Sequence, residues 1–457
     1  MKKLVFAAVA AVSLGAAQGA GFGIYEASAR GNAVGGALVG DAFEVDATAN
    51  YYNPANIAFA TNIQLAVGAT FINPYCDVKV DGQTQDRMNP GWFTVPSFYF
   101  TVPLPMDFAF GFGTYTEFGL GTRYGSNWTL AGDTQKTTMR QVTLNPNLAY
   151  KITDRWSVSG GLRFSWIQFI NHKSPYHRDT LYQDVDQLVS ANVRAQGTVS
   201  APDAYHLNSR LKGDDWGVGW NAATSFKATE DLSFGLVYRS QIKHKIKGNY
   251  DMYGNVDGDA SGTLNLVAGG NTISQMPFAQ HIHLSQYEHG SASAKLRLPR
   301  SITAGVNWRA TEKWRIGGTV TWTEWSSVKN IDFKLPYGHS FRQPLHWNDV
   351  WRFGIGNEYD VLDWLTLRCG YIYDMDPSSK HNGTTMIPSG DRHIIGTGLG
   401  FKLAENLYLD LGYSFIRMNN DDRFIKVKTR EGETKHYKFA THNGFSHLVS
   451  ATIRYSF

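Results

Sequence analysis

The stretch Phe445-Ser-His-Leu-Val-Ser-Ala-Thr-Ile-Arg-Tyr-Ser-Phe457 ends the chain and alternates between two kinds of side chain. Val449, Ile453 and Phe457 share one parity, and Ser450 and Arg454 lie on the other. A period of two residues is typical of a β-strand between an apolar and a polar medium. In a membrane barrel the apolar face would meet lipid and the polar face the lumen. A soluble β-sandwich would give the same alternation, so other parts of the chain must decide.

Six short turns repeat this pattern along the chain. They fall at 104–107, 153–156, 229–232, 311–314, 361–364 and 404–407, and each joins two alternating runs. After the second turn, Trp156, Val158, Leu162 and Phe164 share one parity, and Arg163 lies on the other. Such repetition favours an outer-membrane β-barrel over an isolated amphipathic strand.

The turns and runs together predict an all-β fold, a transmembrane antiparallel β-barrel of fourteen strands over residues 62–457. An even number of strands places both ends of the barrel on one side, as bacterial barrels require, with short periplasmic turns and long external loops. The expected strands are 62–72, 92–102, 107–117, 139–151, 155–170, 214–228, 231–249, 291–310, 313–325, 349–360, 363–375, 390–403, 405–419 and 443–457. A terminal strand that ends in Phe457 resembles the signal read by the barrel-assembly machinery, an expected partner.

The N-terminal residues indicate export. Lys2 and Lys3 precede an apolar stretch, 4–15, that is too short to span a bilayer, and small residues at 17 and 19 suit a cleavage site. We therefore expect residues 1–19 to be a signal peptide. Without these two lysines, 41 basic residues face 39 acidic ones, which gives no electrostatic surface for nucleic acid.

The composition suits a membrane barrel. No later stretch reaches the roughly 18 apolar residues of a transmembrane helix, but 14% of the residues are aromatic and 46 are glycine. Aromatic residues with glycine suit strands that face lipid and curve into a barrel. The only two cysteines, Cys76 and Cys369, exclude a disulfide scaffold. We do not expect them to pair, and Cys369 has the lipid-facing parity.

Residues 20–61 precede the first strand and are rich in Gly and Ala. A barrel of fourteen strands has a lumen wider than its side chains fill, since roughly eight strands is the filled case. We expect this segment to fold inside the barrel as a plug, or hatch. The alternative is a tail in the periplasm.

Several motifs, taken together in this order, resemble the FadL-type transporters of long-chain fatty acids and other hydrophobic compounds, an outer-membrane family. The hatch carries Gly21–Glu26, Ser28–Gly31, Asp46–Thr48 and Tyr52-Asn53-Pro54-Ala55; the barrel carries Asp215–Ala222, Tyr238–Gly248, Ala294–Pro299, Trp351–Gly354, Arg368–Tyr371 and Asp391-Arg392. The resemblance covers nearly the whole mature chain. It does not extend to the outer loops, where the family binds its ligand.

The resemblance implies a passive uptake channel for hydrophobic small molecules, either long-chain fatty acids or aromatic hydrocarbons. It implies capture at the extracellular mouth, a pocket against the N-terminal peptide with Phe22, and lateral release at a kinked third strand. Gly111 and Gly113 in that strand would permit a local break in pairing, although barrel curvature would explain them equally well. A side exit delivers an apolar molecule to lipid without a passage through water.

A carboxylate ligand would require a cation near the outer mouth. By position the candidates are Arg342, Lys173 and His172, which could instead contact phosphates of lipopolysaccharide. In the same region, the spacing of Leu181, Val185, Leu188, Val189 and Val193 predicts a small amphipathic helix over 179–195.

Two alternative functions are a general hydrophilic porin and an outer-membrane enzyme. The expected plug argues against the porin. No G-x-S-x-G motif occurs and the fourteen histidines are scattered, so no catalytic residue is assigned. His281, His283 and His289 are more simply explained as solvated than as a metal site, so neither metal nor cofactor is expected. The expected partners are a hydrophobic substrate and outer-membrane lipid with lipopolysaccharide, and the expected state is a monomer.

Overall fold

The computed structural model describes residues 21–88, 91–125, 128, 130–131, 133–381, 383–428 and 434–457. The expected signal peptide, 1–19, lies outside the described residues. Among these residues, no helix combines the length and the hydropathy that a membrane-crossing helix requires.

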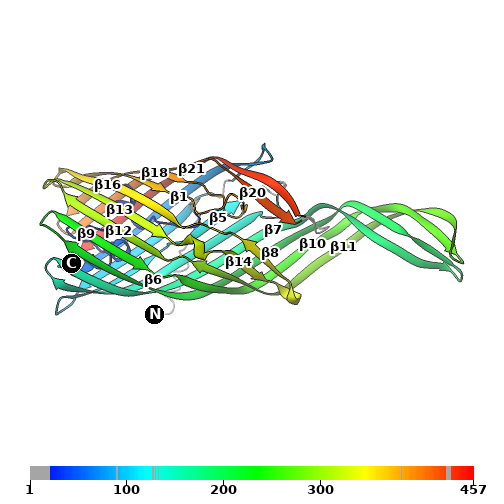
Figure 1. The fold of residues 1–457 in the computed structure, drawn as a ribbon, viewed down its shortest axis with the longest axis horizontal. Helices are drawn as coiled ribbons and strands as arrows, with labels where there is room; N and C mark the ends of the chain where they lie inside the picture. Colours follow the sequence, from blue (N-terminus) through cyan, green and yellow to red (C-terminus); the bar gives the residue numbers. More distant parts are fainter. Residues whose placement is uncertain are drawn as a thin grey trace.

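The alternating runs form a closed, antiparallel, all-β barrel, as predicted (Figure 1). β21 pairs with β1, with Ser456 opposite Gln64, and this pairing closes the wall. In order round the wall the 14 strands are β1 (Gln64–Val80), β3 (Phe93–Pro103), β4 (Phe108–Tyr115), β6 (Lys136–Thr153), β7 (Trp156–Ser190), β8 (Val193–Lys227), β9 (Leu232–Arg239), β12 (Ser301–Arg309), β13 (Trp314–Thr323), β16 (Val350–Leu362), β17 (Leu365–Asp374), β18 (Arg392–Ala404), β19 (Leu407–Met418) and β21 (Thr434–Ser456). Each expected strand has its counterpart here.

The two parities separate as expected. Apolar side chains such as Leu162, Ile355 and Ile453 are exposed on the outside of the barrel, where lipid covers them. Cys369 belongs to this outer face, as predicted from its parity. Polar residues of the opposite parity, among them Arg163 and Asp410, are buried in the lumen. The short turns gather at the end that holds the C-terminus (Figure 1).

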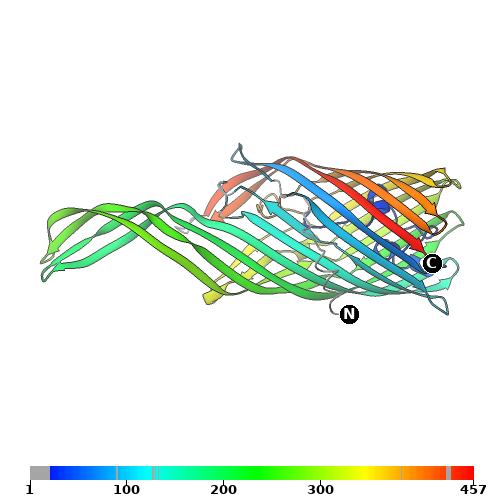
Figure 2. The same ribbon diagram turned by 180° about the vertical axis from the view of Figure 1, so that it is seen from behind.

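Two long hairpins extend the wall far beyond the barrel (Figures 1 and 2). β10 (Ile242–Ala268) and β11 (Asn271–Leu298) pair with each other, and β10 also pairs with β8, which pairs with β7. The regions 170–214 and 249–291, which we expected to be loops, are therefore largely strand. The predicted helix over 179–195 is wrong, because this segment lies in the β7–β8 hairpin. Its apolar residues are mostly leucine and valine, and pairing along a four-stranded sheet overrides the helical spacing.

Shorter elements surround the extracellular mouth. β2 (Gln83–Met88) pairs with the end of β1, and β20 (Asp421–Lys428) pairs with the start of β21. β14 (Asn330–Lys334) pairs with β11 and with β15 (Ser340–Pro344). The 3-10 helices η2 (Trp325–Ser327) and η3 (Pro336–Gly338) flank β14. β5 (Gly119–Arg123) continues the line of β4 and pairs with β6.

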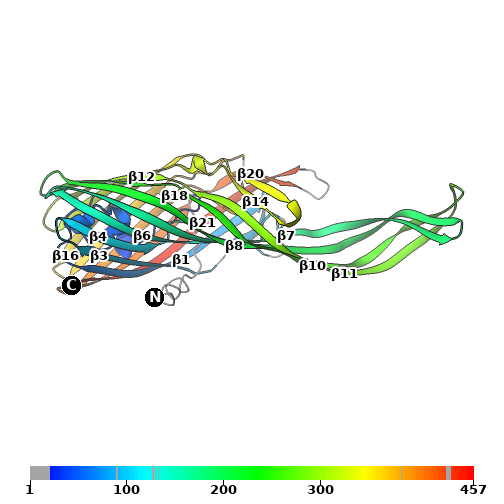
Figure 3. The ribbon, with the colours of Figure 1, turned by 90° about the horizontal axis from the view of Figure 1, so that it is seen from below.

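The segment before β1 lies inside the barrel, as the hatch prediction requires (Figure 3). It contains α2 (Ala29–Ala33), α3 (Ala49–Tyr52) and the 3-10 helix η1 (Asn56–Phe59). Ser28 caps α2, since its Oγ accepts a hydrogen bond from the Gly31 backbone N–H. α2 packs against β17, β18, β19, β21 and β1, while η1 packs against β4, β6 and β7. The hatch therefore touches most of the circumference.

Candidate functional site

A buried network of ion pairs fixes the hatch to the wall. Arg30 of α2 lies 2.6 Å from Glu358 of β16 and 2.7 Å from Asp41 of the hatch. The network continues round the wall through Arg368–Glu358 (2.6 Å), Arg368–Asp410 (2.7 Å) and Arg454–Asp410 (2.6 Å), and returns to the hatch through Arg454–Asp46 (3.1 Å). Removal of one partner from such a network leaves a buried charge uncompensated, at a cost of about 3–5 kcal/mol. These pairs therefore oppose displacement of the whole hatch.

The motif Tyr52-Asn53-Pro54-Ala55 forms a second attachment. The Asn53 Nδ2 donates to the carbonyl oxygens of Val39 (2.9 Å) and Thr224 (3.1 Å), so it joins two parts of the hatch to β8. Ser157 of β7 donates to the Ala55 carbonyl oxygen at 2.8 Å. Asn53 and Ala55 thus attach the hatch to the wall, while Tyr52 lines the cavity described below.

Gly111 and Gly113 do not open the wall. Gly111 lies opposite Thr101 of β3 and Asn147 of β6, and Gly113 is paired on both sides in the same way. The expected break in pairing therefore does not lie at these two glycines, and their role in release stays a prediction. A Cβ on Gly111 would lie 1.8 Å from Asn50 Oδ1 and 2.6 Å from Ile57 Cδ1. The glycine makes room for the hatch, because these two residues belong to α3 and η1.

The third strand does break, but further along. β4 ends at Tyr115 and β5 begins at Gly119, and both pair with β6 on one side. On the other side, β3 pairs with β4 only over 98–103, so that 93–97 and β5 have no partner across this seam among the described residues. Pro96, which has no N–H to donate, lies in the part of β3 that has no partner on the β4 side, although it is paired with β1 on the other side. The wall therefore has an interrupted seam in its extracellular half.

The N-terminal end of the hatch pairs with the broken strand from inside. Gly23 forms a β-bridge with Phe118, the Ile24 N–H donates to the Glu117 carbonyl oxygen at 2.8 Å, and the Gly119 N–H donates to the Phe22 carbonyl oxygen at 2.9 Å. These backbone hydrogen bonds attach the segment between β4 and β5 to the hatch inside the lumen. The N-terminal end of the hatch is thus bonded directly to the strand that borders the seam.

Phe22 belongs to a close-packed cluster of apolar side chains above the hatch, which we call the apolar chamber. Its ring centroid lies 4.8 Å from that of Trp325, 5.4 Å from that of Trp347 and 5.8 Å from that of Phe118, and the side chain is 1% exposed. The same cluster continues with inward residues of β6, β7, β10, β11 and β14, among them Met139, Ile167, Ile242, Leu296 and Phe333. Phe22, which belongs to the N-terminal peptide, therefore lies in an apolar environment, and its contact with a ligand stays a prediction.

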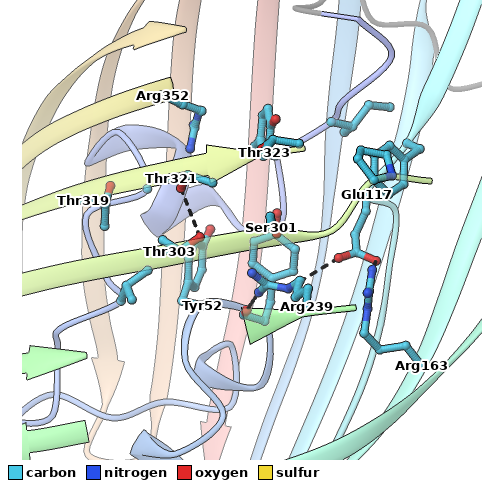
Figure 4. Close-up of a pocket in the computed structure, with 17 residues that line it drawn as sticks. Tyr52, Glu117, Arg163, Arg239, Ser301, Thr303, Thr319, Thr321, Thr323 and Arg352 are labelled. Carbon is cyan, nitrogen blue, oxygen red and sulfur yellow. Dashed lines mark hydrogen bonds and ion pairs between the residues drawn. The ribbon is translucent and has the colours of Figure 1, made fainter. Parts of the chain in front are cut away.

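A small polar cavity of about 60 Å³ adjoins the chamber (Figure 4). Arg163 and Arg239 both form ion pairs with Glu117. The Arg239 Nε lies 3.5 Å from the Glu117 Oε1. The Arg352 guanidinium also lines the cavity and lies 4.3 Å over the Tyr25 ring, and its Nε has no hydrogen-bond partner among the described residues. Two guanidinium groups thus share the Glu117 carboxylate, and Arg352 adds a third positive charge to the lining, which gives the cavity a net positive charge.

The three cations predicted at the mouth do not converge. Arg342 is exposed on β15 and pairs with Asp332 at 2.6 Å. Lys173 faces inward with its ammonium 5.0 Å from the Phe341 ring, and burial lowers its pKa. His172 lies between Lys136 and Arg210 on the neighbouring strands; burial and these two positive charges lower its pKa. In the part of the chain that the structure describes, no three His, Cys, Asp or Glu residues gather as for a metal ion.

Sequence reasoning missed the cavity arginines, although a signal was present. Arg163, Arg239 and Arg352 each lie at an inward position of an alternating strand, where a charged residue needs a partner or a ligand. The parity was visible in the sequence, but the pairing of distant strands that brings them together was not. Trp347 lies in an outer loop that offered no alignment, and Trp325 was expected only as the last residue of the strand 313–325, whereas the structure places it in η2.

Comparison with known proteins agrees with this arrangement. A family model described as "Outer membrane protein transport protein (OMPP1/FadL/TodX)" matches residues 9–457. A long-chain fatty acid transport protein of Escherichia coli O6:H1 is 28% identical, with 100% of this chain and 98% of that protein covered. Outer membrane protein P1 of Haemophilus influenzae is 25% identical, with 98% and 97% covered.

Solved structures share the fold. A FadL homologue of Pseudomonas aeruginosa has a TM-score of 0.75 at 20% identity, with 96% of this chain and 100% of that chain covered. The toluene transporter TodX of P. putida has a TM-score of 0.64 at 17% identity, with 94% and 98% covered. The match across the chain and the fourteen-stranded barrel of the bacterial outer membrane together show that this chain belongs to the OMPP1/FadL/TodX family of outer-membrane transport proteins.

Proposed function

We propose that this protein is a passive channel that takes up hydrophobic small molecules and releases them sideways into the outer membrane. The observation that carries the proposal is the interrupted seam between 93–97 and β5, beside the apolar chamber of Phe22. An apolar molecule that leaves through this seam enters lipid directly, so no apolar surface need cross water. The relatives named for fatty acid and toluene transport support the substrate class.

The ligand enters by displacing part of the hatch. The cavity of about 60 Å³ has room for only a few water molecules, so an alkyl chain requires space that Phe22 and its neighbours now fill. Captured at the extracellular mouth, the chain replaces the Phe22 ring against Trp325 and Trp347. Because residues 22–24 are bonded to the break in strand three, this displacement acts on the seam. The ion pairs of Arg30 keep the rest of the hatch in place.

Charge in the cavity favours a fatty acid over a neutral aromatic hydrocarbon. Three guanidinium groups face one carboxylate, and the Arg352 Nε has no partner among the described residues. A carboxylate head beside Arg352 would pair with the positive charge of the cavity, and its alkyl chain would lie among the apolar side chains of the chamber. A hydrocarbon such as toluene would leave the excess charge unpaired.

Photo-crosslinking tests the route in the unaltered protein. Cells that carry the channel would take up a long-chain fatty acid with a diazirine on its tail, and mass spectrometry would map the adducts. We expect adducts on Phe22 and Trp325, and then on both sides of the seam, at 93–98 and 119–123. Adducts on Glu44, Asp46 and Arg315, which face the periplasmic end of the lumen, would show an axial route and overturn lateral release.

A further inference from the structure

The outer surface of the wall carries a basic face where the long hairpins leave the barrel. It consists of seven exposed cations: Lys243, Lys245 and Lys247 on β10, Lys295 and Arg297 on β11, Lys334 on β14 and Arg342 on β15. On β10 these lysines alternate with Ile242, His244 and Ile246, which are buried. The basic face therefore points away from the lumen.

Strand register brings like charges together on this face. Lys245 lies directly opposite Lys295, and Lys243 lies directly opposite Arg297. Like charges at directly opposed positions destabilise a sheet. Arg342 pairs with Asp332, but none of the other six cations has an ion-pair partner among the described residues. Asp332 lies opposite Lys295 and Asp214 lies opposite Lys247, but these two carboxylates leave the seven cations with a net positive charge that an external anion would offset.

The basic face surrounds an open groove of about 650 Å³. Lys245, Lys295, Lys334 and Arg342 line it, together with Asp332, which pairs with Arg342. These cations come from four adjacent strands, so several of them reach one bound group at once. A groove of this size admits a phosphorylated sugar head rather than a single small ion.

The height of the basic face on the wall identifies the anion. Ile302, which is 40% exposed to lipid, lies opposite Tyr238 on the neighbouring strand. Arg297 precedes Ile302 by five residues, so it lies roughly 16 Å from Ile302 along the strand, toward the extracellular side. Lys247 lies opposite Asp214, two residues beyond the exposed Trp216. The cations thus begin where the apolar band ends on the extracellular side, at the level of the outer-leaflet phosphates.

We propose that the basic face binds the phosphate groups of lipid A, the glycolipid that anchors lipopolysaccharide in the outer leaflet. Lysine and arginine donate charge-assisted hydrogen bonds to phosphate, and several cations at a membrane surface add their attractions. Bound lipid A would also neutralise the opposed pairs Lys245–Lys295 and Lys243–Arg297. The site is a structural lipid site, separate from the lumen.

Native mass spectrometry of the purified barrel, titrated with bisphosphorylated lipid A, tests the proposal. The variant is Lys245→Gln with Lys295→Gln. The control is Lys313→Gln with Lys402→Gln, two exposed lysines at the periplasmic end. At about 1 kcal/mol for each lysine near an anionic surface, the test variant should bind about 30-fold more weakly. The control should bind like the unaltered protein, and dephosphorylated lipid A should bind weakly to all three.

Equal binding by the test variant and the control would overturn the proposal, as would undiminished binding of dephosphorylated lipid A. Displacement of lipid A by an equal concentration of inorganic phosphate would identify a small-anion site instead, and would also overturn it. Heat-modifiable migration on gels reports folding of each variant. If the first pair does not fold, Arg297→Gln with Lys334→Gln tests the same face from its other edge and carries the same expectation.

Discussion

Gly111→Ala should loosen the hatch and leave the wall intact. The new Cβ would overlap Asn50 Oδ1, at 1.8 Å, and Ile57 Cδ1, at 2.6 Å. Overpacking of a close-packed site costs about 1–3 kcal/mol. Asn50 would also lose the hydrogen bonds that its Nδ2 donates to the Thr101 Oγ1 (2.9 Å) and the Ala47 carbonyl oxygen (3.0 Å), each worth about 1 kcal/mol. A total near 3 kcal/mol raises the fraction of unseated hatch about 150-fold.

Hydrogen exchange over 47–57 and conductance in planar bilayers measure this effect. The control is Gly160→Ala, because a Cβ there meets only the Asn221 carbonyl oxygen, at 4.0 Å. We expect Gly111→Ala to exchange faster over 47–57 and to leak small solutes, with normal heat-modifiable folding and no change in the control. If Gly111→Ala exchanged slowly over 47–57 and conducted poorly but blocked uptake, the hatch would still be seated. That result would contradict a role of Gly111 in seating the hatch and would assign this residue to the exit.

Three further predictions concern the hatch, the cavity and the topology. Deletion of residues 21–60 should leave a folded barrel, since the closed wall satisfies its own backbone hydrogen bonds, but bilayer conductance should rise; unchanged conductance would contradict the plug. Arg352→Leu should weaken binding of a long-chain fatty acid about 10-fold, as expected for one lost charge-assisted hydrogen bond, and leave alkylbenzene binding unchanged; equal losses would argue against a carboxylate site. Cysteine at Asn271 should react with an impermeant label on intact cells and cysteine at Asp154, whose side chain is 98% exposed, should not; labelling at Asp154 would reverse the orientation.

The barrel was predictable because every wall strand separates two media. The parity of residues such as Arg163, Cys369 and Asp410 then follows from local sequence alone. The extension was not predictable in this way. Its small buried cluster of Ala195, Val199 and Leu264, with Val185 packed against it, comes from separate strands whose pairing is not visible in the sequence. The apolar residues near Val185 therefore suggested a helix that does not form.

The site was predictable only in part. The resemblance of the hatch singled out Phe22 as a ligand contact; the structure surrounds it with apolar side chains, and the contact itself stays a prediction. The break in pairing lies in the expected strand but not at Gly111, because this glycine makes room for Asn50 of the hatch, a contact over sixty residues of sequence. The seam depends on which parts of β3 and β5 fail to pair, and pairing between strands is a tertiary property. Pro96 was the available local signal.

A reversible lock between hatch and wall tests lateral release most directly. Asn32 of α2 and Thr70 of β1 are joined by a side-chain hydrogen bond of 3.0 Å, so Asn32→Cys with Thr70→Cys, in a Cys76→Ser, Cys369→Ser background, places two thiols across this contact. Residues 21–27 remain free to move. The measurement is the uptake rate of a labelled long-chain fatty acid by cells with the pair oxidised and then reduced. Lateral release predicts equal rates in both states. Uptake that stops on oxidation and returns on reduction would show that the substrate passes through the hatch.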